Sequence, residues 1–212
     1  HCCEYIGEEL FDICHFKSER RLKAQVILQR VIDITNKISK YFKDEKPLIV
    51  FNCGAMSMHD EPNTLKLDAN LIHDHFKKLD MKNTGFIAQN MPPYPWYFGG
   101  QWRGHYFLEA QELLKFCEAT GESICLDTSH GQMACTYLGV NFSEYAKELM
   151  PFVKHLHISD ADGVEGEGTQ IGTGDVDFQS FFDVYKNYKG TWIPEIWQGH
   201  INNNYDAKKA LG

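Results

Sequence analysis

The sequence predicts an α/β fold in which parallel strands alternate with helices, as in a (β/α)8 barrel. Short apolar runs recur along the 212 residues and are separated by stretches with helical periodicity. Four of these runs, at 85–89, 123–127, 154–157 and 191–195, each end at a polar residue that can bind a metal ion. A (β/α) barrel carries such residues at the carboxyl ends of its strands, where its active site forms. The pattern therefore also indicates an enzyme.

The individual elements follow one another regularly. Apolar residues at three- to four-residue spacing predict a helix over residues 20–42, and Pro47 then precedes an apolar strand at 48–52. Further helices are expected near residues 65–79, 108–120, 142–150 and 178–188. Because apolar strands that alternate with helices are typical of a parallel sheet, we expect a single domain over residues 1–212.

The number of units suggests a partial barrel. A complete barrel usually needs about 250 residues, and we count only about five and a half βα units in this chain. The chain opens on His1 without an initiator Met. We therefore expect that one or two βα units of the barrel are absent at the N-terminal side. Two long polar loops, at 90–105 and 159–177, follow strands and are expected on the active-site side.

Composition limits the classes of function. The formal net charge of −8 and the pI near 5.7 disfavour binding that depends on neutralising nucleic-acid phosphates, and favour a small-molecule ligand. No apolar run reaches the roughly 18 residues of a membrane span. The seven cysteines form no CxxC pair, and several lie in apolar runs. Reduced thiols and a cytoplasmic location fit this usage.

The strand-end residues form a mixed set of carboxylates and imidazoles. Asp127 and His130 follow one strand, His157 and Asp160 follow the next, and Glu195 follows the last. Such a set suits one divalent ion such as Mn²⁺, Mg²⁺, Co²⁺ or Zn²⁺. Taken singly, each residue has a structural explanation, such as a helix N-cap for an aspartate or a hydrogen-bonded histidine. Their occurrence together favours a metal site.

Two loop segments carry further candidates. Residues 91–102 bring aromatic side chains, including Trp96 and Trp102, among prolines and glycines. Aromatic faces beside a polar site are suited to stacking on sugar rings, although the same loop fits a lid or a contact in a homo-oligomer. The glycine-rich segment 162–174 lacks the lysine of a phosphate-binding loop, so we expect a mobile active-site loop.

At this point the sequence resembles a known family. The runs Leu126-Asp-Thr-Ser-His130, His157-Ile-Ser-Asp160 and Pro194-Glu195, with the segments 171–178 and 1–5, resemble the xylose isomerase-like TIM barrels. These include sugar phosphate isomerases, ketose 3-epimerases and, more distantly, endonuclease IV. The resemblance covers nearly the whole chain and implies a TIM barrel that acts on a small sugar or sugar phosphate.

The resemblance also implies roles for particular residues. Epimerase-like members hold one divalent ion with Glu, Asp, His and Glu, and their two glutamates transfer protons. Here this implies metal binding by Asp127, His157 and Glu195, with Gln89 at the position of the first glutamate and His130 near substrate oxygens. Substrate contacts are expected from a further set: Trp96, Trp102, Asp160, Trp197 and His200.

Gln89 is the departure from the pattern. A glutamine offers a carbonyl oxygen to a metal ion but cannot exchange a proton at neutral pH. The favoured function is a metal-dependent sugar isomerase or epimerase that works through an enediolate, with Glu195 as the catalytic base and His130 orienting a substrate oxygen. A barrel that lost catalysis and binds a sugar or a protein stays open. A metal-dependent hydrolase or AP endonuclease is a weaker alternative, because Asn52 and Gln89 occupy positions where the nuclease branch needs further ligands.

Overall fold

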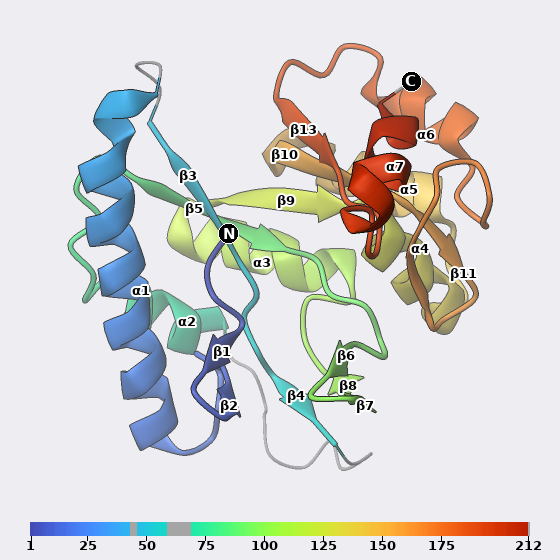
Figure 1. Cartoon of the computed structure of the whole chain (residues 1–212). Coiled ribbons are helices and arrows are strands. Elements are labelled where there is room, and N and C mark those ends of the chain that lie inside the picture. Colours follow the sequence, from blue (N-terminus) through green and yellow to red (C-terminus); the bar gives the residue numbers. More distant parts are fainter. Residues whose placement is uncertain (43–45, 59–68, 212) are drawn as a thin grey trace.

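A five-stranded parallel sheet forms the centre of the protein. The computed structural model describes residues 1–42, 46–58 and 69–211. The sheet has the order β13-β10-β9-β5-β3 and is curled, so that the fold is a half-barrel (Figure 1). Its strands are β3 (Leu48–Phe51), β5 (Gly85–Gln89), β9 (Ser123–Asp127), β10 (Val153–Ile158) and β13 (Thr191–Pro194). All four neighbouring pairs are parallel, which confirms the predicted α/β class.

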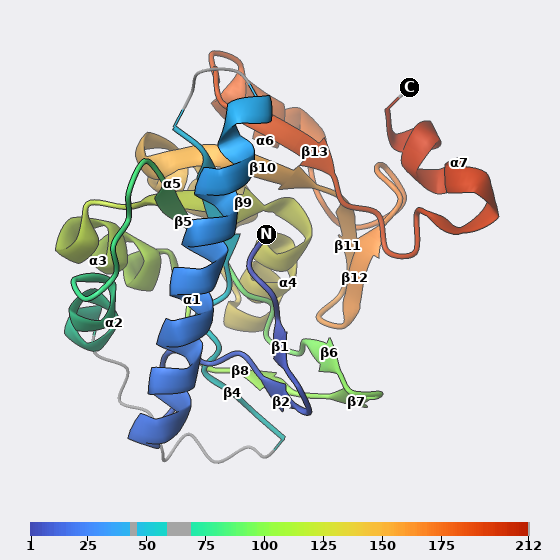
Figure 2. The same ribbon diagram turned by 60° about the vertical axis from the view of Figure 1, so that its left-hand side comes forward.

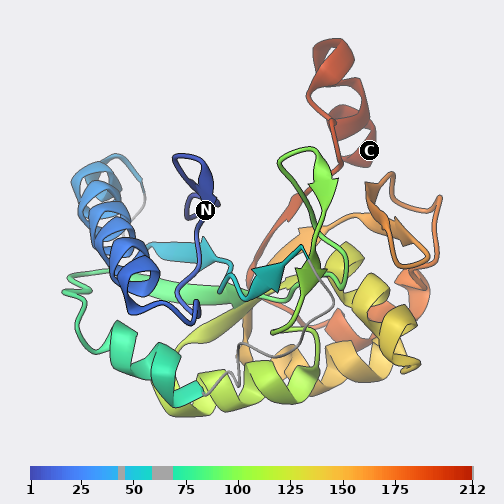
Figure 3. The same cartoon turned by 90° about the horizontal axis from the view of Figure 1, so that it is seen from below.

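Helices cover one face of this sheet. They are α1 (Ser18–Ile38), α2 (Ala69–Phe76), α3 (Ala110–Thr120), α4 (Thr128–Leu138), α5 (Phe142–Leu149) and α6 (Phe178–Tyr185). Figure 3 shows α2 and α3 beneath the sheet, whereas the hairpin near the N-terminus and α7 (Ile201–Ala210) lie on the other side. Figure 2 shows that α7 stands away from the sheet. Among the described residues, no helix has the length and apolar character needed to cross a membrane.

The two faces of the sheet differ in how they are packed. On the helical face, Phe51, Phe76, Phe86 and Phe116 form an aromatic cluster with ring centroids 4.9 to 5.9 Å apart. Aromatic pairs at this spacing stabilise a core by about 0.5 to 1.5 kcal/mol each beyond their burial. On the concave face, the described residues form a small buried apolar cluster of Val50, Ile87 and Cys125. The helical face therefore anchors the sheet and the concave face is left for a site.

Local signals explain how the central strand is placed. Helix α3 begins with a capping box between Glu109 and Glu112 and ends at Gly121, whose φ of 72° is the left-handed conformation that favours glycine. Strand β9 starts two residues later, at Ser123. The predicted helix over residues 108–120 is thus confirmed, and its sharp end determines where β9 begins.

Several sequence-based boundaries need correction. The predicted helix over residues 20–42 ends at Ile38 and continues as a short 3-10 turn, Ser39–Tyr41. In the predicted helix over 65–79, residues 65–68 lie outside the described residues, and α2 starts at Ala69. The sequence did not predict α4 at all, because Thr128, Ser129 and Gly131 interrupt its apolar pattern.

The long loops also contain structure that was not predicted. The loop at 90–105 holds a hairpin of β6 (Trp96–Tyr97) and β7 (Gly100–Gln101), and β8 (Arg103–Gly104) pairs with β4 (Met56–Ser57). The loop at 159–177 holds a second hairpin, β11 (Asp160–Asp162) with β12 (Gly166–Thr169). A third hairpin, β1 (Tyr5–Ile6) with β2 (Glu9–Leu10), lies near the N-terminus. These hairpins bring side chains to the sheet edge that strand patterns alone do not reveal.

Candidate metal centre

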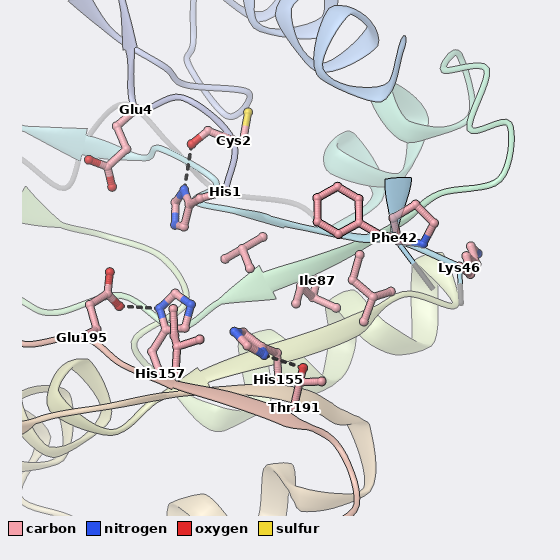
Figure 4. Close-up of a pocket in the computed structure, with 14 residues that line it drawn as sticks. His1, Cys2, Glu4, Phe42, Lys46, Ile87, His155, His157, Thr191 and Glu195 are labelled. Carbon is pink, nitrogen blue, oxygen red and sulfur yellow. Dashed lines mark hydrogen bonds and ion pairs between the residues drawn. The ribbon is translucent and has the colours of Figure 1, made fainter. Parts of the chain in front are cut away.

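Three potential metal ligands converge where the parallel strands end. One ligand atom from each of Asp127, His157 and Glu195 lies within 4.8 Å of the other two. Asp127 and His157 are each only 2% exposed, whereas the Glu195 side chain is 47% exposed. Figure 4 shows Glu195 and His157 pointing toward each other. The structure therefore brings these three residues together, as the sequence predicted.

The register of the sheet creates this convergence. Asp127 at the end of β9 lies beside His157 on β10, so both side chains point to the same face. The Glu195 N–H donates to the Ile158 carbonyl at 3.1 Å, which continues the pairing of β10 and β13 one residue beyond β13. Glu195 is thereby held beside the other two residues.

Asp127 performs two tasks with its two carboxylate oxygens. Oδ1 accepts the backbone N–H of His130 at 3.0 Å and so caps α4. Oδ2 accepts from Gln89 Nε2 at 3.0 Å and lies 3.8 Å from His157 Nδ1. The N-cap interpretation and the metal-ligand interpretation of Asp127 are therefore compatible.

Asn90 holds the backbone of Asp127 and was not predicted from the sequence. Its Oδ1 accepts the Asp127 N–H at 2.7 Å, and its Nδ2 donates to the Asp127 carbonyl at 3.0 Å. Asn90 is fully buried. An amide directly after a strand-end residue was the only signal in the sequence, and many loop asparagines share it.

The donor set around His157 fits a cation. Its Nδ1 contacts Glu195 Oε2, lies 3.2 Å from Gln89 Nε2 and lies 3.8 Å from Asp127 Oδ2. One nitrogen cannot donate a proton to Glu195 and accept one from Gln89 at the same time. A cation among these atoms would remove the conflict, because the imidazole lone pair and both carboxylates would then face positive charge. The residues present therefore fit a single divalent ion.

The pKa values of the two carboxylates in the cluster are shifted in opposite directions. Burial raises the pKa of Asp127. For Glu195 burial acts in the same direction, but the contact with His157 outweighs it and lowers the pKa. The more exposed carboxylate is thus the one that stays ionised most readily.

His130 is a cation that bridges two acceptors. Its Nδ1 lies 2.9 Å from the Asn90 carbonyl oxygen and its Nε2 lies 3.0 Å from Glu167 Oε1. Burial lowers the pKa of His130, but the Asp127 and Glu167 carboxylates outweigh burial and raise the pKa to about 10. Both ring nitrogens therefore donate at neutral pH, and His130 brings positive charge to the edge of the site.

Two cavities adjoin the cluster. A small one of about 120 Å³ is lined by Gln89, Trp96, His130, Glu195 and Trp197, among other residues. A larger one of about 730 Å³ follows the concave face of the sheet and includes Val50, Ile87, His155, His157 and Ile193 (Figure 4). Both cavities reach Glu195, so a bound molecule in either would meet its carboxylate.

The other predicted substrate contacts lie elsewhere. Trp102 lines a separate cavity of about 240 Å³, and its indole N–H donates to the Tyr97 carbonyl at 3.1 Å. His200 is exposed and precedes α7, and it does not line either cavity beside the cluster among the described residues. The geometry places Trp96 and Trp197 at the site, but not Trp102 or His200.

Asp160 has a structural role in place of the predicted substrate contact. It is fully buried, and its two carboxylate oxygens accept four backbone N–H groups at 2.9 Å. The donors belong to Ala161, Gly172, Gly174 and Val176. Asp160 therefore holds the glycine-rich segment that was expected to be mobile, and its carboxylate is not free to bind a ligand.

The sequence and the fold were compared with known proteins. All residues from 1 to 212 match the sequence profile of the xylose isomerase-like TIM barrel family. A search of curated proteins gave no match. Among solved structures, a D-tagatose 3-epimerase-like protein is similar with a TM-score of 0.70 and 15% identity, over 98% of this chain and 73% of that chain.

Two further structures are similar at the same level. The 3-keto-D-glucoside 4-epimerase YcjR from E. coli has a TM-score of 0.66 and 16% identity, over 94% of this chain and 73% of that one. A D-allulose 3-epimerase from Methylomonas sp., solved with D-allulose, has a TM-score of 0.65 and 15% identity, over 93% of this chain and 66% of that one. The protein belongs to the xylose isomerase-like TIM barrel family. The similar structures establish its fold.

Proposed function

We propose that the protein is a metal-dependent isomerase or epimerase of a small sugar, in which Glu195 moves a proton at a carbon beside a carbonyl group. One observation carries this proposal: Asp127, His157 and Glu195 converge at the edge of a cavity that Trp96 and Trp197 line. The similar structures named as sugar epimerases support a carbohydrate as the substrate.

The cluster would hold the ion, and one of its ligands, Glu195, would also react with the substrate. Asp127, His157 and Glu195 would be the ligands, and Gln89 stands beside them as a neutral fourth residue. A bound divalent ion would polarise the oxygens of an open-chain sugar and stabilise the negative charge of an enediolate. The protein itself positions the ligands through Asn90 and the parallel register, so little rearrangement is needed.

Glu195 is the proton-transfer group. Its side chain is half-exposed and reaches the cavity, and the contact with His157 keeps it ionised at neutral pH. An ionised carboxylate at this position can take a proton from a substrate carbon. The His130 cation adds positive charge at the cavity wall, where negative charge develops on the substrate oxygens.

Gln89 favours chemistry with one base. Its Nε2 donates to Asp127 and its Oε1 lies 2.8 Å from His1 Nε2, so the amide is bound at both ends. An amide does not exchange protons at neutral pH. Glu195 would therefore remove a proton from one carbon and return it to the neighbouring carbon, while the hydroxyl proton passes from one substrate oxygen to the other, which is an isomerisation.

Replacement of Glu195 by glutamine tests the proposal. Glu195→Gln keeps the size of the side chain but removes the base, so sugar turnover should fall by about 10²- to 10⁴-fold. The measurement is proton exchange at the substrate carbon in D₂O, followed by NMR over a panel of ketoses with Mn²⁺ supplied. Thermal unfolding should stay cooperative and its midpoint should fall only slightly, because the contact with His157 that is weakened involves a half-exposed carboxylate. Exchange at the wild-type rate in this variant would refute the role of Glu195.

A second candidate function is a binder without catalysis. The amide at Gln89, in place of the acidic residue of the epimerase pattern, is the observation that favours it. Such a protein would bind a sugar but show no proton exchange in the wild type. The hydrolase or endonuclease alternative has less support, because Asn52 donates to Glu4 at 2.9 Å and Gln89 donates to Asp127. Cytoplasmic location and homo-oligomer formation stay predictions.

A further inference from the structure

The small cavity beside the metal centre contains two carboxylates that the proposed reaction does not use. Glu4 precedes β1, and Glu167 lies on β12 in the hairpin of the glycine-rich loop. Both line this cavity together with Glu195. Figure 4 shows the carboxylate of Glu4 on the same side of the site as that of Glu195. Neither residue was singled out from the sequence.

Each of these carboxylates is held through only one of its oxygens. Glu4 Oε1 accepts from Asn52 Nδ2 at 2.9 Å and from the Tyr97 hydroxyl at 3.3 Å. Glu167 Oε1 accepts from His130 Nε2 at 3.0 Å. In the described part of the chain, the Oε2 atom of either residue has no hydrogen-bond partner. Each side chain is thus fixed in orientation and keeps a free acceptor.

The charges around the cavity decide which ligand suits these acceptors. The described residues that line it include Glu4, Glu167 and Glu195, but no Lys or Arg. The His130 cation also lines the cavity, but its Nε2 is already paired with Glu167. A phosphate group would therefore meet the free carboxylate oxygens of Glu4 and Glu167, and like charges at short range repel. Sugar hydroxyls, by contrast, are neutral donors that match free carboxylate oxygens. The aromatic side chains of Trp96 and Trp197 supply apolar surface for the C–H face of a sugar.

We propose that Glu4 and Glu167 form a hydroxyl-binding subsite that selects an unphosphorylated sugar. The hydroxyls of the sugar donate to the free Oε2 atoms of both residues while its reacting carbons lie next to Glu195. The subsite thereby narrows the substrate class from sugars and sugar phosphates to neutral sugars. It rests on the proposed function, because the sugar is the molecule on which Glu195 acts.

The test is a set of binding measurements that does not require turnover. D-Allulose, D-tagatose and D-fructose are titrated calorimetrically into the Mn²⁺-supplied protein, and D-fructose 6-phosphate is titrated in parallel. At least one neutral sugar should bind, and D-fructose 6-phosphate should bind more weakly than D-fructose. Glu4→Gln and Glu167→Gln should each weaken the binding of the neutral sugar about tenfold, because a charge-assisted hydrogen bond becomes a neutral one.

Glu165→Gln is the matched control. Glu165 lies in the same hairpin, is exposed and does not line the cavity, so its removal should leave the affinity unchanged. Gln at position 167 still accepts from His130, and thermal unfolding of each variant confirms that the fold is kept. If Glu165→Gln lost as much affinity as Glu4→Gln and Glu167→Gln, the effect would be one of overall charge and the subsite would be refuted.

The remaining outcomes separate this proposal from the proposed function. Equal or tighter binding of D-fructose 6-phosphate, no binding of any neutral sugar, or full affinity in Glu4→Gln and Glu167→Gln would each overturn the subsite. None of these results changes the test of Glu195 by proton exchange. Conversely, sugar binding that depends on Glu4 and Glu167 without any proton exchange in the wild type would keep the subsite and refute the isomerase.

Discussion

The two halves of the candidate metal centre are built differently. Asp127 and His157 lie on neighbouring central strands, are 2% exposed and are fixed by the sheet register and by Asn90. Glu195 lies one residue beyond edge strand β13 and exposes 47% of its side chain. The buried half is suited to hold an ion in place, whereas the exposed half can reach a substrate. Within one cluster, Asp127 and His157 are thus held rigidly, and Glu195 is accessible to a substrate.

The largest expected effect falls on the buried half. Asp127→Ala removes the N-cap of α4, the buried carboxylate that accepts from Gln89 Nε2, and the negative charge 3.7 Å from the His130 cation. Loss of a cap costs about 1 kcal/mol and a stranded buried partner about 1 to 3 kcal/mol, so the free energy of unfolding should fall by about 2 to 4 kcal/mol. Urea denaturation without added metal measures this.

Asn141→Ala provides the control for the cap alone. The Asn141 side chain accepts the Glu144 N–H at 3.0 Å at the start of α5, far from the cluster. This variant should lose only about 1 kcal/mol. If Asp127→Ala loses no more than Asn141→Ala, the buried contacts of Asp127 do not stabilise the fold and the distinction between the two halves fails.

A smaller effect is expected at the neutral residue of the cluster. Gln89→Glu places a carboxylate 3.0 Å from Asp127 Oδ2, which repels it when no cation is present. The apo protein should be less stable than the wild type, and Mn²⁺ should bind about tenfold more tightly, equivalent to about 1.4 kcal/mol. Thermal unfolding without Mn²⁺ measures the loss of stability, and thermal unfolding with Mn²⁺ measures the tighter binding of the ion. A variant that Mn²⁺ stabilises no more than it stabilises the wild type would show that no ion is held beside this position.

The smallest effect concerns a buried carboxylate outside the cluster. Burial raises the pKa of Glu112, in the capping box of α3, to about 7 from an ordinary value of 4.5. The folded state therefore binds more protons than the unfolded state between about pH 4.5 and 7, and its stability falls as the pH rises through that window. Because the Glu112 carboxyl is partly exposed, we expect the free energy of unfolding to fall by about 1 kcal/mol across this window.

Glu112→Gln should remove this pH dependence. Glutamine still accepts the Leu108 and Glu109 N–H groups that Glu112 Oε2 binds, but it does not titrate. The measurement is the free energy of unfolding at pH 5 and at pH 7.5 for both proteins. An equal slope in the wild type and the variant would show that another group is responsible for the titration.

The sequence predicted the parts of the fold that depend on local patterns. Strands β5 and β9 were predicted with the observed bounds, because their apolar runs end sharply at Gln89 and Asp127. Helix α4 was missed because tertiary contacts stabilise it, including the Thr128 hydroxyl that donates to the Ser159 carbonyl at 2.6 Å. A pattern search along the chain cannot detect such a contact.

The candidate site shows the same division. Asp127, His157 and Glu195 were predictable, since strand ends of a parallel sheet meet at one edge. Glu4 and Glu167 were not, because hydrogen bonds to residues distant in sequence hold both side chains at the cavity. Asp160 was predicted to contact the substrate, but its carboxylate accepts hydrogen bonds from loop amides. A polar residue directly after a strand has the same sequence context in both roles.

Metal analysis tests the central claim most directly. The wild type and Asp127→Ala are each equilibrated with excess Mn²⁺ or Zn²⁺, dialysed and measured by mass spectrometry of the bound element. We expect one ion per chain in the wild type and none in Asp127→Ala, since one of three convergent ligands is lost. No ion in the wild type, or an equal content in both proteins, would contradict a metal centre at the ends of these strands.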